Sequence, residues 1–183
     1  LDYETSGLLV ASKHKRAESI LKTTFETRGM QKEYTALLFG HLAGELEVEC
    51  LLEPIKILEQ KVMQGAAEQG KHSLTIFEPL EYFDKYDMTL VRAKPYTGRL
   101  HQIRLHAAHI GHPIVGEPIY RKDIDMARDY LDKKMDTAER IERTGAKRIC
   151  LHASKISFEY SEKSYEIESP MDSKKEFLTA LSD

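Results

Sequence analysis

The sequence lacks the features of membrane proteins, disulfide-rich proteins and zinc-ribbon proteins. No uninterrupted apolar run approaches the roughly 20 residues that a membrane span needs. Cys50 and Cys150 lie far apart and neither has a CxxC companion, so neither a disulfide scaffold nor a zinc ribbon is indicated. A reducing, cytoplasmic compartment fits this cysteine usage best. Internal repeats and low-complexity linkers are also missing from the sequence.

The sequence also has no excess of positive charge. Its 27 Lys and Arg residues and 30 Asp and Glu residues give a formal net charge of -3. This balance argues against a protein that coats nucleic acid by charge alone, although a local basic patch can bind phosphate on an acidic protein. The net charge therefore neither predicts nor excludes RNA binding.

The length and composition predict one globular domain over residues 1–183. The chain is 41% hydrophobic and 31% charged, which is ordinary for such a domain, and at this size roughly 70% of the unfolded chain's surface can be buried. Nothing in the sequence calls for more than a monomer. Because the chain opens at Leu1 without an initiator Met or a signal peptide, we interpret it as a fragment that lacks upstream residues.

The first forty residues predict a strand, a helix and a second strand. Residues 7–11 form a short apolar run typical of a buried strand, and Ser12 is the expected N-cap of a helix that ends at Gly29. Residues 32–39 suit a strand in which Lys32 and Tyr34 point to the same side by period two. One face of that strand would therefore carry both polar side chains.

Further along, turn signals and apolar runs favour antiparallel pairing. Short strands are expected between turns at residues 44, 53–54, 65, 70 and 78–79, followed by a strand over 88–94. A second helix follows the turn at 95–98 and ends near 111–113, and the charged residues 123–144 predict a surface helix or a partly mobile insert. Residues 149–160 and 164–168 predict a hairpin. The apolar stripe expected on the second helix is Leu100, Ile103, Ala107 and Ile110.

Arg104 is the most informative residue of the second helix. At about 100° per residue it falls about 40° from Leu100, on the flank of the apolar stripe and on the same side as His101. A half-buried guanidinium needs an acidic partner, which can be a structural carboxylate or a group in a binding site. The turn at Gly98 and Arg99, near a helix N-terminus, is also a natural anion site.

The histidines at 101, 106, 109 and 112 do not predict a metal site. On one helix, the last three fan over about 240°, so they cannot converge on one ion. The sequence contains no HExxH motif and no cysteine companion for them.

The polar turn before the first strand contains Asp2, Glu4, Thr5 and Ser6. Local rules interpret it as an ordinary turn with a hydroxyl cap. Two nearby carboxylates also suggest a glycoside hydrolase, in which an acid and a base act on opposite sides of the bond. However, an i,i+2 pair in one turn is poorly placed to flank a sugar. The basic run at 13–16 fits a solvated helix start that can also touch phosphate.

Five segments, in order, resemble the RluA-type RNA pseudouridine synthases. Residues 1–8 (LDYETSGL) resemble the family's RLDxxTSG loop, in which the Asp is catalytic, and residues 32–36 (KEYTA) resemble its KxYxA strand. Residues 97–104 (TGRLHQIR) resemble its TGRxHQIR segment. The match continues at residues 111–120 (GHPIVGEPIY) and 151–153 (LHA).

Some positions depart from the family pattern. The His-Arg pair and the strands that normally precede the Asp motif are not in this sequence, Leu100 stands where Thr or Ser is usual, and Glu117 stands where Asp is usual. Neither substitution replaces a residue that the resemblance makes catalytic. The segment 121–147 is longer than in the simplest family pattern.

The resemblance implies an α+β fold, with a mixed, largely antiparallel sheet, helices packed on its outer side and an RNA cleft across it. It implies that specific uridines of rRNA or tRNA are isomerised to pseudouridine without a metal, nucleotide or redox cofactor. By the same resemblance, Asp2, Tyr34 and Arg104 are catalytic. The implied RNA-binding residues are Lys32, Thr97, Gly98, Arg99 and His101.

Two alternatives stay open beside the enzyme hypothesis. A non-catalytic RNA-binding fragment of the same fold would bind RNA without turnover, and a hydrolase using Asp2 and Glu4 would release free base or sugar. The sequence also leaves open whether Asp2 attacks C1′, attacks the base or removes a sugar proton.

Overall fold

One twisted sheet organises the chain. The structure, a computed structural model, describes residues 1–27, 29–58 and 61–181, and within them eight strands follow the order β1-β7-β2-β6-β5-β3-β4, with β8 paired to β7. Only the short β1–β7 pair is parallel, which confirms the α+β fold with a mixed, largely antiparallel sheet. The strands are β1 (Ser6–Gly7), β2 (Met30–Phe39), β3 (Leu46–Leu58), β4 (Lys61–Ala67), β5 (Lys71–Phe83), β6 (Met88–Pro95), β7 (Leu151–Tyr160) and β8 (Lys163–Glu168).

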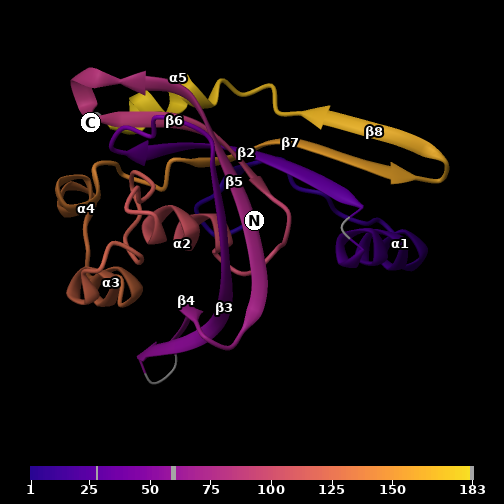
Figure 1. Cartoon of the computed structure of the whole chain (residues 1–183), viewed down its shortest axis with the longest axis horizontal. Coiled ribbons are helices and arrows are strands. Elements are labelled where there is room, and N and C mark those ends of the chain that lie inside the picture. The colour runs from indigo at the N-terminus through magenta and orange to yellow at the C-terminus, as the bar shows by residue number, and fades with distance from the viewer. Residues whose placement is uncertain (28, 59–60, 182–183) are drawn as a thin grey trace.

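The helices lie around this sheet rather than between its strands. In Figure 1, α2, α3 and α4 lie together below the sheet, while α1 lies at the opposite end, beneath the β7–β8 hairpin. Among the described residues, no helix combines the length and the apolar character required to cross a membrane. The helices are α1 (Lys15–Glu26), α2 (Gln102–His109), α3 (Ile124–Leu131), α4 (Thr137–Thr144) and α5 (Ser173–Ala180), with a 3-10 turn η1 (Asp84–Tyr86).

The core forms where α2 covers the central strands. Ala36 and Leu38 of β2, Phe77 of β5, Val91 of β6 and Ala107 of α2 are all fully buried in one cluster. The C-terminal half of β2 is covered on both faces, which explains why its residues form a continuous apolar run. The core therefore fixes β2, which carries Lys32 and Tyr34, and α2, which carries Arg104.

The first predicted strand and its helix cap were wrong in detail. Only Ser6–Gly7 pairs, and the chain then leaves the sheet, so that Leu9 is 73% exposed. Gly7 has a φ of +107°, and a Cβ there would lie 2.3 Å from the Ala153 carbonyl oxygen, so the close approach to β7 requires glycine. The cap of α1 is His14, whose Nδ1 accepts from the Ala17 amide at 3.2 Å, and not Ser12.

Three predicted turns, at 53–54, 65 and 78–79, were also wrong, because these residues lie inside long strands. β3 pairs with β5 only up to Leu52, so Pro54 lies where one edge of β3 is unpaired and its missing N–H costs no ladder bond. Pro79 similarly lies beyond the last β3 partner of β5, at a bulge against β6. Gly44 and Gly70 do lie outside the strands, as predicted.

Two helical predictions also need correction. The charged segment 123–144 forms two helices, α3 and α4, rather than one surface element, and Met126 is only 2% exposed. Leu100 does not join the stripe on α2, because His101 adopts a left-handed φ of 54° and Leu100 is 51% exposed. The hairpin of β7 and β8 is confirmed, with Ser161 and Glu162 at its turn.

The side chain of His106 connects α2 to strands β5 and β3 of the sheet. It is fully buried, and its Nε2 lies 2.8 Å from Ser73 Oγ of β5 and 3.3 Å from Cys50 Sγ of β3. Burial is the main reason that the pKa of His106 is lowered from 6.5 to about 4. The imidazole is therefore neutral in the folded protein at neutral pH.

We expect the Gly116→Ala variant to be strongly destabilised. Gly116 has a φ of +83°, and a Cβ there would lie 1.9 Å from the Arg148 carbonyl oxygen, so the backbone must shift. Gly111→Ala is the matched control, since its φ is +82° but nothing lies within 4 Å of its Cβ position. In urea unfolding, Gly111→Ala should cost about 1–2 kcal/mol and Gly116→Ala clearly more. Equal losses would contradict this account of Gly116.

We also expect stability to fall as the pH drops from 6.5 towards 4. Because the folded pKa of His106 is depressed, the unfolded chain binds more protons in this window, and the free energy of unfolding falls by up to about 3 kcal/mol from this group. Urea unfolding across this pH range should be less pH-dependent in His106→Gln than in the wild type. The same slope in both proteins would show that His106 is not buried as neutral imidazole.

Candidate active site

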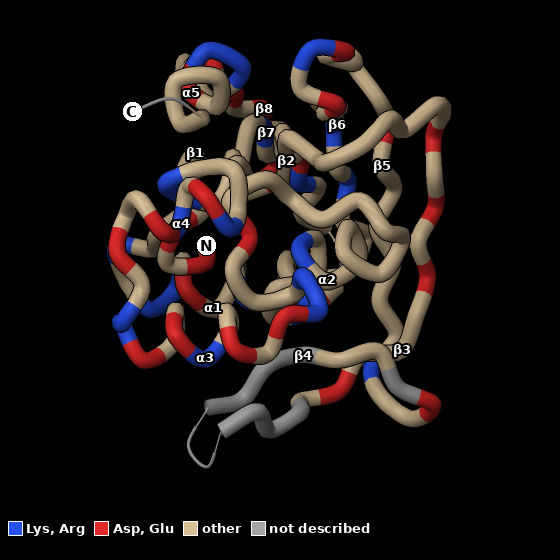
Figure 2. The backbone as a smooth tube through the Cα atoms, turned by 90° about the vertical axis from the view of Figure 1, so that its left-hand side faces the viewer, with Lys and Arg blue, Asp and Glu red and all other residues tan. Residues whose placement is uncertain are grey.

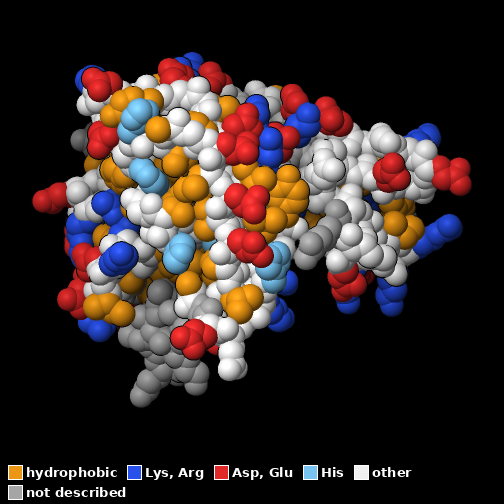
Figure 3. All heavy atoms as spheres, in the orientation of Figure 1, with side chains coloured by type: hydrophobic (Ala, Val, Ile, Leu, Met, Phe, Trp, Pro, Cys, Tyr) orange, Lys and Arg blue, Asp and Glu red, His pale blue; other side chains and the backbone are white. Residues whose placement is uncertain are grey.

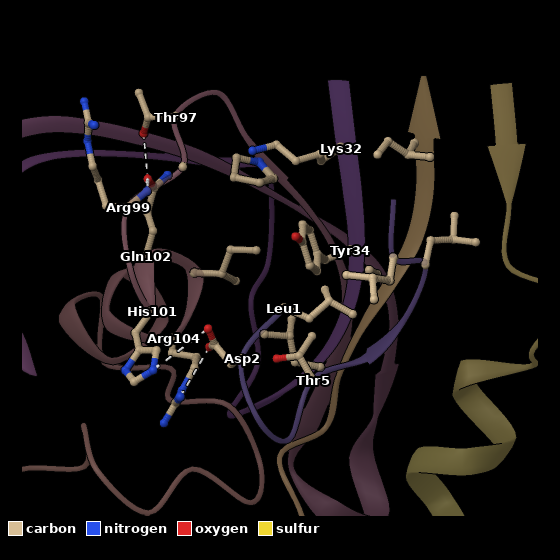
Figure 4. A pocket seen from close by; sticks show the side chains of 18 of the residues that line it. Leu1, Asp2, Thr5, Lys32, Tyr34, Thr97, Arg99, His101, Gln102 and Arg104 are labelled. Carbon is tan, nitrogen blue, oxygen red and sulfur yellow. Dashed lines mark hydrogen bonds and ion pairs between the residues drawn. The ribbon is translucent and has the colours of Figure 1, made fainter. Parts of the chain in front are cut away.

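A cavity of about 310 Å³ opens between the N-terminal loop, β2 and the turn before α2. Its walls come from segments far apart in the sequence, and Figure 4 shows their side chains around one space. Lys32 and Tyr34 both line it, as their shared side of β2 predicts. All eight predicted site residues contribute to the lining: Asp2, Lys32, Tyr34, Thr97, Gly98, Arg99, His101 and Arg104.

Asp2 lies in a tight turn at the edge of this cavity. Its carbonyl oxygen accepts from the Thr5 amide at 3.1 Å, and its side chain is 20% exposed. Arg104 Nη1 donates to Asp2 Oδ2 at 3.3 Å, and His101 Nε2 lies 3.9 Å from Oδ1. The Thr5 hydroxyl lines the same cavity and is buried without a hydrogen-bond partner among the described residues. The turn therefore presents two polar groups to a ligand.

Arg104 has a second acidic partner that the sequence analysis did not identify. Its Nε and Nη2 donate to the two carboxylate oxygens of Glu117 at 2.6 and 2.9 Å, a bidentate pair. Arg104 is 4% exposed and Glu117 is fully buried. Glu117 Oε1 also accepts from the Ile119 amide at 2.8 Å. An acidic residue inside the apolar run 114–119 was the available signal for such a buried pair.

The charge state of Arg104 follows from this pairing. Burial alone lowers the pKa of Arg104, but the Glu117 carboxylate and its hydrogen bonds outweigh burial, so the net shift is upward. The guanidinium thus stays charged. With Nε and Nη2 committed to Glu117, Nη1 is the nitrogen that faces Asp2.

His101 is held between Asp2 and Tyr120. Its Nδ1 lies 2.9 Å from the Tyr120 hydroxyl, and the Tyr120 ring centroid lies 5.4 Å from Arg104 Cζ. Burial, and then the charge of Arg104, lower the pKa of His101. The side chain is therefore a neutral hydrogen-bonding group at neutral pH, not a second fixed cation.

Tyr34 and Lys32 face the cavity from β2. Burial raises the pKa of Tyr34, and the Asp2 carboxylate raises it further, so the phenol stays protonated. Burial lowers the pKa of Lys32. In the described part of the chain no acidic side chain pairs with Lys32, and a Cβ added at Gly98 would lie 3.3 Å from its Nζ. The ammonium group is thus available to an anion beside the turn at 97–99.

Gln102, another residue that the sequence analysis did not select, shapes that turn. Its Oε1 accepts from Thr97 Oγ1 at 2.7 Å and from the Arg99 amide at 3.0 Å. Its Nε2 donates to the Leu74 carbonyl and to Thr75 Oγ1. Thr97 is 5% exposed and its hydroxyl also accepts from the Leu74 amide. Thr97 therefore supports the turn and has no free hydroxyl for RNA.

The remaining predicted residues diverge from Asp2. Arg99 points away from it in Figure 4 and donates through Nε to the His72 carbonyl at 3.2 Å. The histidines do not converge either: His101 faces Asp2, His106 faces Ser73, and His112 bonds to the Phe39 carbonyl. Within the described ranges, no group of three His, Cys, Asp or Glu side chains is arranged to hold a metal ion.

Glu4 is not a second catalytic carboxylate. It accepts from both terminal nitrogens of Arg140, at 2.6 Å for Nη1, and from the Tyr130 hydroxyl at 2.7 Å. Burial raises the pKa of Glu4, but Arg140 and Tyr130 outweigh burial and lower it overall. Because Glu4 is ionised, engaged on both oxygens and outside the cavity lining, the hydrolase hypothesis that paired it with Asp2 was wrong.

The chain is similar to RNA pseudouridine synthases over most of its length. The family model described as RNA pseudouridylate synthase matches residues 1–109. Over 171 residues the chain is 38% identical to the dual-specificity RNA pseudouridine synthase RluA of Vibrio parahaemolyticus, covering 90% of this chain. Over 176 residues it is 36% identical to the ribosomal large subunit pseudouridine synthase C of Vibrio cholerae, covering 94% of this chain.

A solved structure has the same fold. The human protein called RNA pseudouridylate synthase domain containing 1 matches 100% of this chain and 69% of its own, with a TM-score of 0.71 and 27% identity. The chain spans 60% of the length of the Vibrio parahaemolyticus relative and 50% of that from Vibrio cholerae.

We expect Glu117→Gln to destabilise the protein by about 3 kcal/mol, because it leaves the buried Arg104 charge without its bidentate partner. Glu139→Gln is the control, since Glu139 pairs with Arg143 at the surface and is 40% exposed, a pair worth at most about 1 kcal/mol. The free energies of unfolding in urea test this. Similar losses in the two variants would mean that Glu117 does not compensate Arg104.

Proposed function

Since the chain belongs to the RluA-type RNA pseudouridine synthases, we propose that it converts uridines of RNA to pseudouridine, with Asp2 as the essential carboxylate. The observation that carries this proposal is the placement of Asp2 in a cavity beside a buried, fixed cation. Arg104 binds one oxygen of Asp2 and leaves Oδ1 facing the cavity, with His101 at 3.9 Å. A carboxylate with one oxygen that Arg104 does not bind is placed to act as nucleophile or base.

The reaction itself requires little beyond positioning. The N1–C1′ bond of uridine breaks, the base turns, C5 bonds to C1′, and the C5 proton leaves while N1 gains one, so the change is an isomerisation. Arg104 orients the Asp2 carboxylate through the hydrogen bond from Nη1. No metal, nucleotide or redox cofactor has a role in this scheme, and we propose that none is needed.

Tyr34 is the proposed partner of the base. Its ring lines the same cavity as Asp2, and its phenol is protonated at neutral pH because its pKa is raised. A flat, half-buried ring can stack on uracil while its hydroxyl relays a proton at C5. We assign Tyr34 to both tasks, with Asp2 at the sugar side of the bond.

We propose that a few positively charged side chains near the cavity bind the RNA backbone. The formal net charge is -3, and on the face seen in Figure 3 acidic and basic side chains of the described residues are interspersed. We therefore propose that RNA binding uses a few groups near the cavity. Lys32 and the free end of Arg99 are the proposed phosphate contacts. A cavity of about 310 Å³ is at the small end for ligand sites, so a single flipped-out nucleotide enters it.

The proposed substrates are uridines of rRNA or tRNA. One relative is named for the ribosomal large subunit and another for dual-specificity action on RNA. We propose that the protein acts as a monomer, because nothing in the sequence calls for a second chain.

The decisive variant is Asp2→Asn in the whole protein. It should bind RNA with a Kd close to that of the wild type but form pseudouridine at least about 10³-fold more slowly, because the amide cannot act as nucleophile or base. Tritium release from RNA labelled at uridine C5 measures turnover, and Asp125→Asn, at an exposed residue of α3, is the control.

Retained turnover in Asp2→Asn would rule out the role assigned to Asp2. Binding without tritium release by the wild type would instead favour a non-catalytic RNA-binding module. Release of free uracil would indicate hydrolysis of the glycosidic bond.

A further inference from the structure

Arg140 of α4 connects two segments that carry site residues. Its guanidinium binds both oxygens of Glu4, and Nη2 also donates to the Gly116 carbonyl at 3.0 Å. Arg140 is 9% exposed, and its Cζ lies 5.1 Å from the centroid of the Tyr130 ring on α3. One buried side chain of the segment 121–147 therefore contacts the N-terminal loop and the loop before α3 at the same time.

Both contacts lie next to the Asp2–Arg104–Glu117 arrangement. Glu4 is two residues after Asp2, and Gly116 directly precedes Glu117, the bidentate partner of Arg104. Hydrogen bonds and short stretches of backbone thus form a closed ring. It runs from Asp2 through Arg104 to Glu117, along the backbone to the Gly116 carbonyl, and through Arg140 and Glu4 back along the chain to Asp2. The position of Arg140 sets the separation between the loop that carries Asp2 and the loop that carries Glu117.

The N-terminal loop is otherwise anchored beyond Glu4, where Ser6 Oγ lies 2.9 Å from His152 Nδ1 and the Leu8 amide donates to the Ala153 carbonyl. β1 is only two residues long, and Leu1 and Tyr3, on either side of Asp2, are 54% and 100% exposed. Arg104 contacts Asp2 through one nitrogen at 3.3 Å, which is a long contact for a charge-assisted bond. Glu4, by contrast, accepts from Arg140, from the Tyr130 hydroxyl and from the Ile149 amide.

We propose that Arg140 is a positioning residue, which acts through Glu4 to hold Asp2 in the orientation needed for turnover. The inference rests on the proposed function and assigns a catalytic purpose to the segment 121–147, although none of its described residues lines the cavity. A salt bridge that only stabilised the fold would change the unfolding temperature and leave kcat of the folded protein unchanged.

The test compares Arg140→Gln with Arg143→Gln in the whole protein. Arg143 lies on the same helix, is 25% exposed, and pairs with Asp123, Asp129 and Glu139 of α3, α4 and their flanks. Figure 2 shows both acidic and basic residues along α3 and α4. Well below the unfolding temperature, Arg140→Gln should lower kcat by about 10- to 100-fold at an unchanged KM for RNA. Arg143→Gln should stay within about twofold of the wild type.

A mutant cycle tests whether Arg140 acts through Glu4. Glu4→Gln should lower kcat as Arg140→Gln does, and the double variant should be no slower than either single one, because the two residues act as a unit. Tyr130→Phe, which removes only the hydroxyl that donates to Glu4, should lower kcat by about threefold. This mild change keeps the inference testable if Arg140→Gln does not fold.

The possible outcomes separate the two proposals. Equal kcat values for Arg140→Gln and Arg143→Gln, or multiplicative losses in the cycle, would overturn the positioning role alone. If Arg140→Gln does not fold, an unchanged kcat in Tyr130→Phe would overturn it. A wild-type protein that forms no pseudouridine would overturn the proposed function and the positioning role together.

Discussion

The guanidinium of Arg104 lies buried between two carboxylates, and the geometry of the site depends on how that charge is compensated. A buried cation without hydrogen-bonded partners would be severely destabilising. Glu117 meets the cost with two short hydrogen bonds and leaves Nη1 directed at Asp2. The core packing of α2 and the bond between His106 and Ser73 keep Arg104 at this place beside the sheet. The carboxylate of Asp2 is thereby oriented by a rigid element, although Asp2 itself lies in an exposed loop.

Much of the site could be predicted because its residues occur in short motifs with strong local constraints. The position of Arg104 on the flank of an apolar stripe predicts an acidic partner, and period two predicts that Lys32 and Tyr34 share a side. The identity of the main partner could not be predicted, because Glu117 reaches Arg104 only after the chain turns back past the end of α2. Gln102 was also missed, since the two bonds from its Nε2 go to Leu74 and Thr75, which only the fold brings near.

The errors in the fold have a common physical origin. Pro54 and Pro79 predict turns by local rules, but both lie where their strands have no partner on one side. Such edges depend on the pairing of the whole sheet and not on local sequence. The charged segment 123–144 was interpreted as a surface element because its polarity is high. Its arginine Arg140 is nevertheless buried against Glu4, a contact that spans 136 positions.

The central claim is that Arg104 acts by its geometry, through a fork that binds Glu117 and Asp2 at once, and not by charge alone. Lysine in its place keeps the positive charge but cannot make both contacts. The most direct measurement is the single-turnover rate of pseudouridine formation by Arg104→Lys at saturating RNA. The account predicts a rate at least about 100-fold below that of the wild type with RNA affinity preserved. A rate close to that of the wild type would contradict it.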